Sequence, residues 1–149
     1  MALAISTVTN SIAALSVTGL TIKDLDEIPY TVNQRDCPII YPEPINFLTD
    51  FDVVMASTGT AGSGYFDVSY TLTYTFCYQA VGADRGSLTK FSNMVQLLED
   101  WWDKILISDH LTGAVEVTPV GIMNLGVVLD PAGYSFIGAT VQLRVLEHE

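Results

Sequence analysis

The sequence predicts an α+β domain spanning residues 1–149, in which an N-terminal helix and one long central helix pack on a largely antiparallel sheet with extended loops. Apolar and polar residues alternate from Tyr65 to Tyr78, which is typical of a long strand with one face on a core. Residues 2–16 and 88–107 instead repeat apolar residues every three or four positions, which indicates amphipathic helices. A chain of 149 residues is long enough for one domain with a substantial core.

The first third of the chain is predicted to contain a short helix followed by proline-rich extended segments. Ala2 to Ser16 is the helical stretch, and Gly19 lies just beyond it as a stop signal. Residues 28–44 hold four of the six prolines, which exclude a central strand but allow a short one at 37–41. The stripe that defines the helix is formed by Ile5, Val8, Ile12 and Leu15.

Residues 47–78 are predicted to form a long hairpin. Phe47 to Ser57 is apolar enough for a strand, and the glycine-rich residues 57–64 form the tip. The strand Tyr65 to Tyr78 follows at once, with Asp67 and four Ser and Thr residues on its polar face. The residues predicted to face the core are Phe66, Val68, Tyr70, Leu72, Tyr74, Phe76 and Tyr78.

The main core helix is predicted after a turn at 82–87. Ser87 is a suitable N-cap residue, and 109–113 would end the helix. Trp102 falls on the predicted core stripe, whereas Trp101, about 100° away around the helix axis, flanks it. The complete stripe is Phe91, Val95, Leu98, Trp102 and Ile105.

The last third is predicted to contain three strands. Val115 to Val120 and Ile122 to Leu129 are apolar runs, and residues 130–133 (Asp-Pro-Ala-Gly) are a turn signal. The final strand, Ser135 to Val145, places Thr140, Gln142 and Arg144 on one side. Its other side carries Ile137, Ala139, Val141, Leu143 and Val145.

The composition limits the classes of function. Charged residues make up only 15% of the chain, which fits either a surface covered by neighbouring subunits or a β-rich surface of Thr and Ser. Six basic against seventeen acidic residues give a net charge of −11. This balance argues against direct nucleic-acid binding, which needs Lys and Arg to displace counterions from phosphates, but not against lining a path for DNA.

Cysteine usage and hydropathy predict a protein that stays in the cell in which it is made. Cys37 and Cys77 have no partner motif, so two free thiols are favoured, with a disulfide as the alternative. No apolar run is long enough for a membrane span. The first basic side chain is Lys23, so a signal peptide is not expected.

No catalytic, cofactor-binding or metal site is predicted, and the chain is not expected to be an enzyme. His110 follows the core helix and His148 is next to the last residue, so capping or solvent exposure is favoured for both. The acidic clusters at 24–27 and 99–103 fit an exposed turn and a solvated helix face. The glycine-rich stretch 59–64 lacks the Lys of a phosphate-binding loop.

The order of these elements resembles that of the tail terminator proteins of long-tailed bacteriophages. The resemblance covers nearly the whole chain and is one of layout, without a signature motif. The features that carry it are a short N-terminal helix (2–16), a proline-punctuated segment (28–42), a glycine-rich tip before the long strand (57–78), the helix 88–107 and closing strands that finish at 133–145.

The resemblance implies a structural virion protein, assembled in the host cytoplasm, that forms a homohexameric ring at the head-proximal end of the tail. Such a ring ends polymerisation of the tail tube protein, contacts a neck or head-completion protein, and lets DNA pass without sequence-specific binding. Another neck protein, a head–tail connector or a tube subunit is the alternative. A third hypothesis is a small-molecule-binding domain with Tyr70, Tyr74, Trp101 and Trp102 around a pocket.

Overall fold

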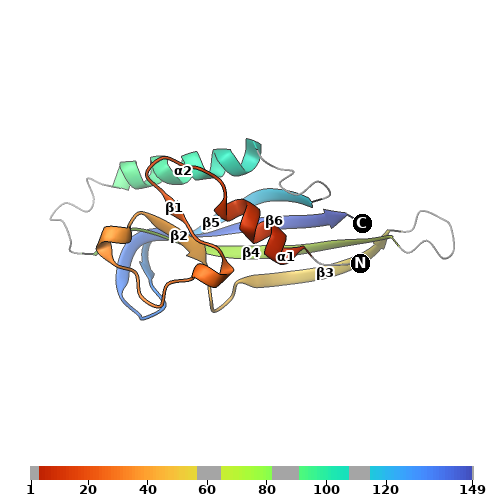
Figure 1. Ribbon diagram of the computed structural model, residues 1–149, viewed down its shortest axis with the longest axis horizontal. Helices are drawn as coiled ribbons and strands as arrows, with labels where there is room; N and C mark the ends of the chain where they lie inside the picture. Colours follow the sequence, from red (N-terminus) through yellow and green to blue (C-terminus); the bar gives the residue numbers. More distant parts are fainter. Residues whose placement is uncertain (1–3, 57–64, 82–90, 108–114, 149) are drawn as a thin grey trace.

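A computed structural model describes residues 4–56, 65–81, 91–107 and 115–148 (Figure 1). The predicted hairpin tip (57–64), turn (82–87) and helix end (109–113) lie outside these ranges. The helices are α1 (Ile5–Ala13), η1 (Leu25–Glu27), η2 (Gln34–Asp36) and α2 (Phe91–Ile107). The strands are β1 (Thr21–Ile22), β2 (Ile39–Pro42), β3 (Leu48–Ala56), β4 (Tyr65–Ala80), β5 (Val115–Leu129) and β6 (Ser135–His148).

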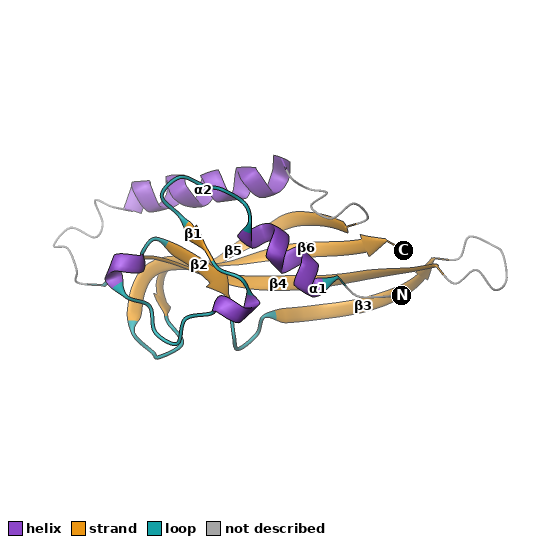
Figure 2. Cartoon of the chain, viewed as in Figure 1, coloured by secondary structure: helices purple, strands orange, loops and turns teal. Residues whose placement is uncertain are grey.

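The six strands form one sheet in the order β1-β2-β4-β6-β5, and β3 pairs with β4 beyond the end of β2. Every pair is antiparallel except β1 with β2. The prediction of an α+β fold with a largely antiparallel sheet is therefore confirmed (Figure 2). Strand β4 runs through the middle of the sheet, with β2 and β3 along one side and β6 along the other.

Strand β4 is more deeply buried than its alternating pattern predicts. Its predicted core positions from Val68 to Phe76 are completely buried, as expected. The threonines on the opposite face are also almost completely covered, because β4 has neighbours along both sides. Thr71, Thr73 and Thr75 are only 4%, 5% and 1% exposed.

Helix α2 is confirmed, and Leu98 and Ile105 of its predicted stripe are buried, but the centre of its buried side lies toward Met94 and Trp101. Trp101 is completely buried and its ring lies 5.9 Å from that of Tyr74, whereas Trp102 is only partly buried. The buried residues of the helix are Met94, Leu98, Trp101 and Ile105. This set is also spaced by four, three and four positions, so periodicity alone does not choose between the two stripes.

The prediction of two strands at 115–120 and 122–129 is wrong, because both belong to the single strand β5. The pairing of β5 with β6 shifts register between Pro119 and Gly121 and again between Met123 and Gly126. Such shifts are β-bulges, which bend a strand without ending it. Asn124 and Gly126 have positive φ angles of 51° and 152°, which suit Asn and Gly at the second bulge.

The final strand has the predicted inward face and extends beyond the predicted end to His148. Gly138 lies where β6 passes closest to β4: a Cβ atom there would be 1.7 Å from the carbonyl oxygen of Phe76. The turn at 130–133 is also confirmed, with the Gly133 N–H donating to the Asp130 carbonyl.

One buried cluster joins both long helices to the sheet. Helix α1 is shorter than the predicted 2–16 and contributes Val8 and Ile12. These residues share the cluster with the buried side of α2 and with the inward residues of β4 and β6. The Ala4 N–H donates to Oε1 of the buried Glu147 at 2.7 Å, which joins the start of α1 to the end of β6.

Candidate self-assembly surface

Exposed apolar side chains are concentrated on strand β5. Six of them, each between 42% and 63% exposed, follow one another along the second half of the strand. They are Val120, Ile122, Met123, Leu125, Val127 and Leu129, and they are called the β5 surface below. Single exposed apolar residues are common in proteins, whereas a contiguous run of this kind makes the strand a candidate contact site.

The backbone of β5 is also open on one side. Within the described ranges β5 pairs only with β6, so it is an edge strand of the sheet. No charged residue occurs from Val117 to Leu129, although charges are the usual means by which edge strands avoid pairing with other chains. The β5 surface therefore combines exposed apolar side chains with a backbone edge that lacks charged protection.

A groove of about 250 Å³ extends the β5 surface onto helix α2. Val95, Leu98 and Trp102 line it from the helix, and Ile122 and Leu125 line it from the strand. The carboxylate residues Glu99 and Asp103 also border this groove. Trp102 thus belongs to this surface and not to the centre of the core.

The opposite edge of the sheet carries a second, smaller group of exposed apolar residues. Ile45, Phe51 and Val53 are 82%, 45% and 49% exposed and are called the β3 surface below. The exposed residues Asp50 and Asp52 lie among them, and β3 has a register shift between Thr49 and Asp52. In Figure 1, β3 forms the lower margin of the sheet.

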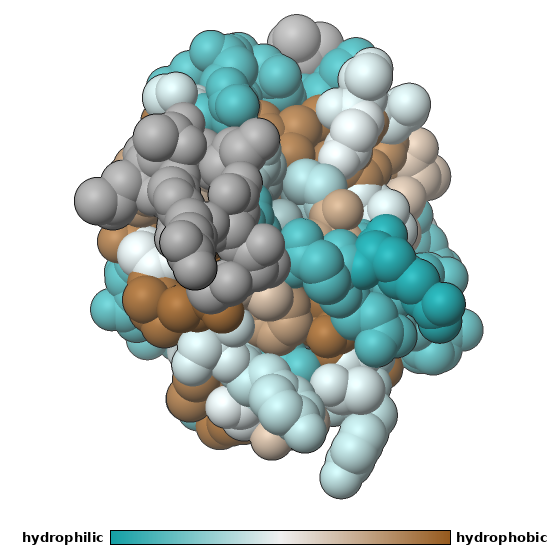
Figure 3. All heavy atoms as spheres, turned by 90° about the vertical axis from the view of Figure 1, so that its left-hand side faces the viewer, coloured by the Kyte–Doolittle hydropathy of each residue, from teal (hydrophilic) through white to brown (hydrophobic). Residues whose placement is uncertain are grey.

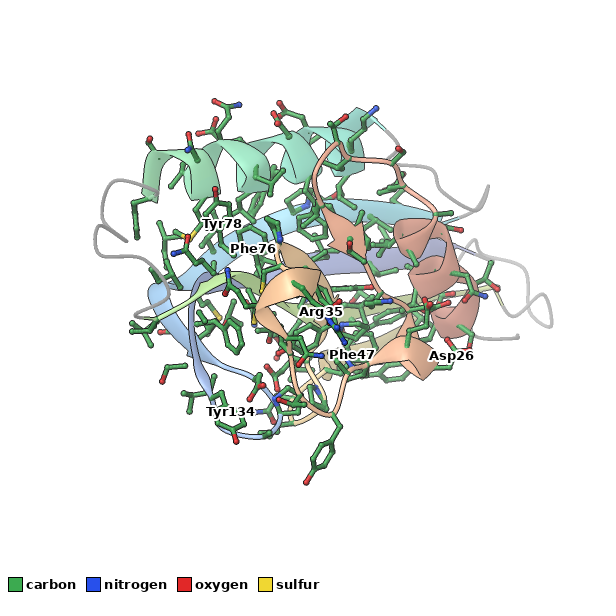
Figure 4. All side chains as sticks on the ribbon, turned by 60° about the vertical axis from the view of Figure 1, so that its left-hand side comes forward. Asp26, Arg35, Phe47, Phe76, Tyr78 and Tyr134 are labelled. Carbon is green, nitrogen blue, oxygen red and sulfur yellow. The ribbon has the colours of Figure 1, made fainter. Side chains whose placement is uncertain are left out.

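A third exposed region lies at the end of the molecule formed by the β5–β6 turn and the loop around residue 31. Tyr30 and Tyr134 are 85% and 66% exposed beside an open hollow of about 900 Å³. Hydrophobic residues reach the surface among polar ones at this end (Figure 3). Tyr134 lies on the far side of the molecule from α2 (Figure 4).

Asp130 links the β5–β6 turn to the loop around residue 31 by hydrogen bonds. Its buried carboxylate accepts hydrogen bonds from the Val32 and Tyr134 N–H groups at 2.9 and 2.8 Å, and from the Thr31 hydroxyl at 3.0 Å. Burial raises the pKa of Asp130, but these hydrogen bonds outweigh it, so that the pKa lies below its ordinary value. Asp130 is therefore a structural carboxylate that positions the end of β5.

The threonine-rich face of the sheet is hollowed into a groove of about 730 Å³, which Ile45 of the β3 surface and Met123, Val127 and Leu129 of the β5 surface also line. Thr73, Thr75, Thr140 and Gln142 line its floor, and the Thr75 hydroxyl donates to Glu43 at the side. No group of three or more metal-ligating side chains occurs in the described part of the chain.

The remaining candidates from the sequence have structural roles or lie outside the described residues. Cys37 and Cys77 are free thiols, and burial raises their pKa values to about 11 and about 12, which keeps both neutral at pH 7. Asp24 caps η1, and the acidic residues of α2 are exposed as predicted. Neither the position of His110 nor the side chain of His148 is described.

The residues of the ligand-pocket hypothesis do not share an open pocket. Tyr70, Tyr74 and Trp101 are completely buried in the core, and Trp102 faces the groove beside β5. Among the described residues, no hydrogen-bond partner is found for the buried Tyr74 hydroxyl or the indole N–H of Trp101, whereas the Tyr70 hydroxyl interacts with the Glu147 carboxylate. Burial raises the pKa of both tyrosines, so their hydroxyls stay protonated.

No helix among the described residues has the length and apolar character needed to cross a membrane. No protein-family model matches this chain, and no curated protein matches it either.

Proposed function

We propose that this chain is a structural subunit of a phage tail, forming a homohexameric ring that ends the tail tube at its head-proximal end. The ring stops polymerisation of the tube protein and provides the contact with a neck or head-completion protein. It assembles in the host cytoplasm, becomes part of the virion and has no catalytic role.

The β5 surface carries this proposal. A long, charge-free edge strand with six exposed apolar residues is a liability in a monomer, because it can pair with any available strand. In a permanent assembly the same surface is buried and stabilises the contact between subunits. Packing both helices on one face of the sheet, as the sequence predicts, leaves the lateral edges available for neighbours.

The charge balance supports a ring around a DNA channel. A net charge of −11 with only six basic side chains gives the subunit little affinity for phosphate. DNA then moves through the channel without being held. The low fraction of charged residues, 15%, suits a subunit with much of its surface against other proteins.

Light scattering at several protein concentrations tests the proposal. We expect a discrete species of about six subunits, in solution or after addition of purified tail tubes, and capped tube ends in electron micrographs. A mass that keeps growing with concentration would instead indicate a tube subunit. A monomer that leaves tube ends uncapped and elongating would contradict the proposal.

A further inference from the structure

We propose that the β5 surface of one copy docks on the β3 surface of the next copy, so that neighbouring subunits meet head to tail at opposite edges of their sheets. This inference rests on the proposed function and names the two surfaces that make the ring contact. A closed ring of more than two identical subunits needs two different, complementary surfaces on each subunit.

The two surfaces lie at opposite lateral edges of the sheet, and each has a member on the face that carries the helices. Val53 pairs with Val68 on β4, and Ile122 pairs with Val141 on β6. Directly paired residues project to the same face, and both Val68 and Val141 belong to the cluster under the helices. Joining β5 of one copy to β3 of the next therefore brings Val53 and Ile122 together on the helix-covered face. Ile45 and Met123, which both line the groove on the threonine-rich face, meet on the other side of the joined strands.

The distribution of charge decides which edges can meet. Pairing two β3 edges would bring Asp50 and Asp52 of one copy against the same carboxylates of the other, which is unfavourable. Strand β5 carries no charge from Val117 to Leu129 and presents an open backbone edge among the described residues, so pairing it with β3 avoids placing one acidic β3 edge directly against another.

A two-fold contact between two β5 edges is the competing arrangement. It would bury the β5 surface but stop at a dimer, and it would leave Ile45, Phe51 and Val53 exposed in the finished particle. The head-to-tail contact covers both apolar surfaces at once and continues until the ring closes.

Complementary blocked variants separate the two arrangements. The β5-blocked variant carries Val127→Asp and Leu129→Asp, and the β3-blocked variant carries Ile45→Asp and Val53→Asp. Alone, each variant has one intact surface, so we expect both to sediment as monomers. Mixed in equal amounts they are expected to form a one-to-one heterodimer and nothing larger, because the second contact is blocked on both chains.

The controls keep the result interpretable. A variant with Ser92→Asp and Asn93→Asp, two exposed residues of α2 outside both surfaces, adds the same charge and should assemble like the parent chain. Circular dichroism melting verifies the fold of each variant. If an aspartate variant unfolds, serine at the same two positions replaces it.

The possible outcomes distinguish this inference from the proposed function. A β3-blocked variant that still assembles like the parent chain would overturn the head-to-tail contact while leaving the ring proposal intact. A mixture that stays monomeric while the parent chain forms rings would do the same. A parent chain that neither forms rings nor caps tubes would overturn both.

Discussion

Strands β3 and β5 are the two long lateral edges of the same sheet, but they differ in how they are protected. Strand β3 has nine residues, a register shift and two exposed carboxylates at Asp50 and Asp52. Strand β5 has fifteen residues and exposes six large apolar side chains with no charge among them. Charges and irregularities are the means by which proteins prevent edge-to-edge association. Only β3 has both.

This comparison indicates that the residues that stabilise the fold and the exposed apolar residues of the β5 surface are separate sets. The residues that hold the sheet and the helices together lie in the cluster around β4, which is completely buried. None of the six β5-surface residues belongs to that cluster, which is why we propose that they act in assembly. Substitutions that disturb one region without the other test this separation.

The largest effect on folding is expected at Trp101. Replacing Trp101 by Ala removes a completely buried ring in contact with Tyr74 and should cost about 3–5 kcal/mol of unfolding free energy. Trp102→Ala is the matched control and should cost less than about 2 kcal/mol, while weakening assembly. Urea denaturation of both variants measures the difference. Equal losses would show that Trp102 also belongs to the core.

The next effect is expected at Asp130, which holds the end of β5. Asp130→Ala leaves the N–H groups of Val32 and Tyr134 unpaired and should cost about 2–3 kcal/mol. Because folding lowers the pKa of Asp130, its stabilisation is present above the unfolded-state pKa and lost as the pH falls through the folded-state pKa. Thermal melting should therefore show a gap between parent and variant that narrows below about pH 4. A gap that stays constant in acid would contradict this role.

A smaller effect, on assembly alone, is expected from the sign of charge placed on β5. Val127 is 63% exposed, so Val127→Asp and Val127→Lys should change folding stability by less than about 0.5 kcal/mol. If β5 meets the acidic β3 edge, the lysine variant should bind its neighbour about tenfold more tightly than the aspartate variant at low salt. Sedimentation at rising ionic strength should reduce this ratio, because salt screens exposed charges. Equal affinities would place β5 against a neutral surface.

The smallest effect is expected from removing the protection of β3. The double variant Asp50→Asn and Asp52→Asn keeps the positive φ of 54° at residue 50 acceptable, since Asn tolerates this conformation. Its fold should be unchanged, but light scattering should detect additional association that the parent chain lacks, because two β3 edges no longer repel each other. A scattering profile identical to that of the parent would mean that the carboxylates do not protect this edge.

Much of the fold was predictable because its signals are local. Alternation along 65–78 and along 135–145 correctly predicts two strands and their residues in the main core, although the threonine face of β4 is covered as well. The phase of α2 was not predictable, because two adjacent stripes of the helix are both apolar. The choice of Trp101 over Trp102 depends on where the sheet lies relative to the helix.

The β5 surface, like helix α2, was only partly predictable from the sequence. From the sequence alone, Ile122 to Leu129 is an apolar run, which equally describes a buried strand and an exposed one. Only the strand order places β5 at an edge, and only its pairing with β6 on both sides of each bulge shows that the two apolar runs form one strand. The sequence by itself determined the fold class, the central strand and the absence of charge along β5, because these depend on residue type and spacing. The tertiary structure decided which apolar residues are covered, because burial depends on neighbours that are distant in the chain.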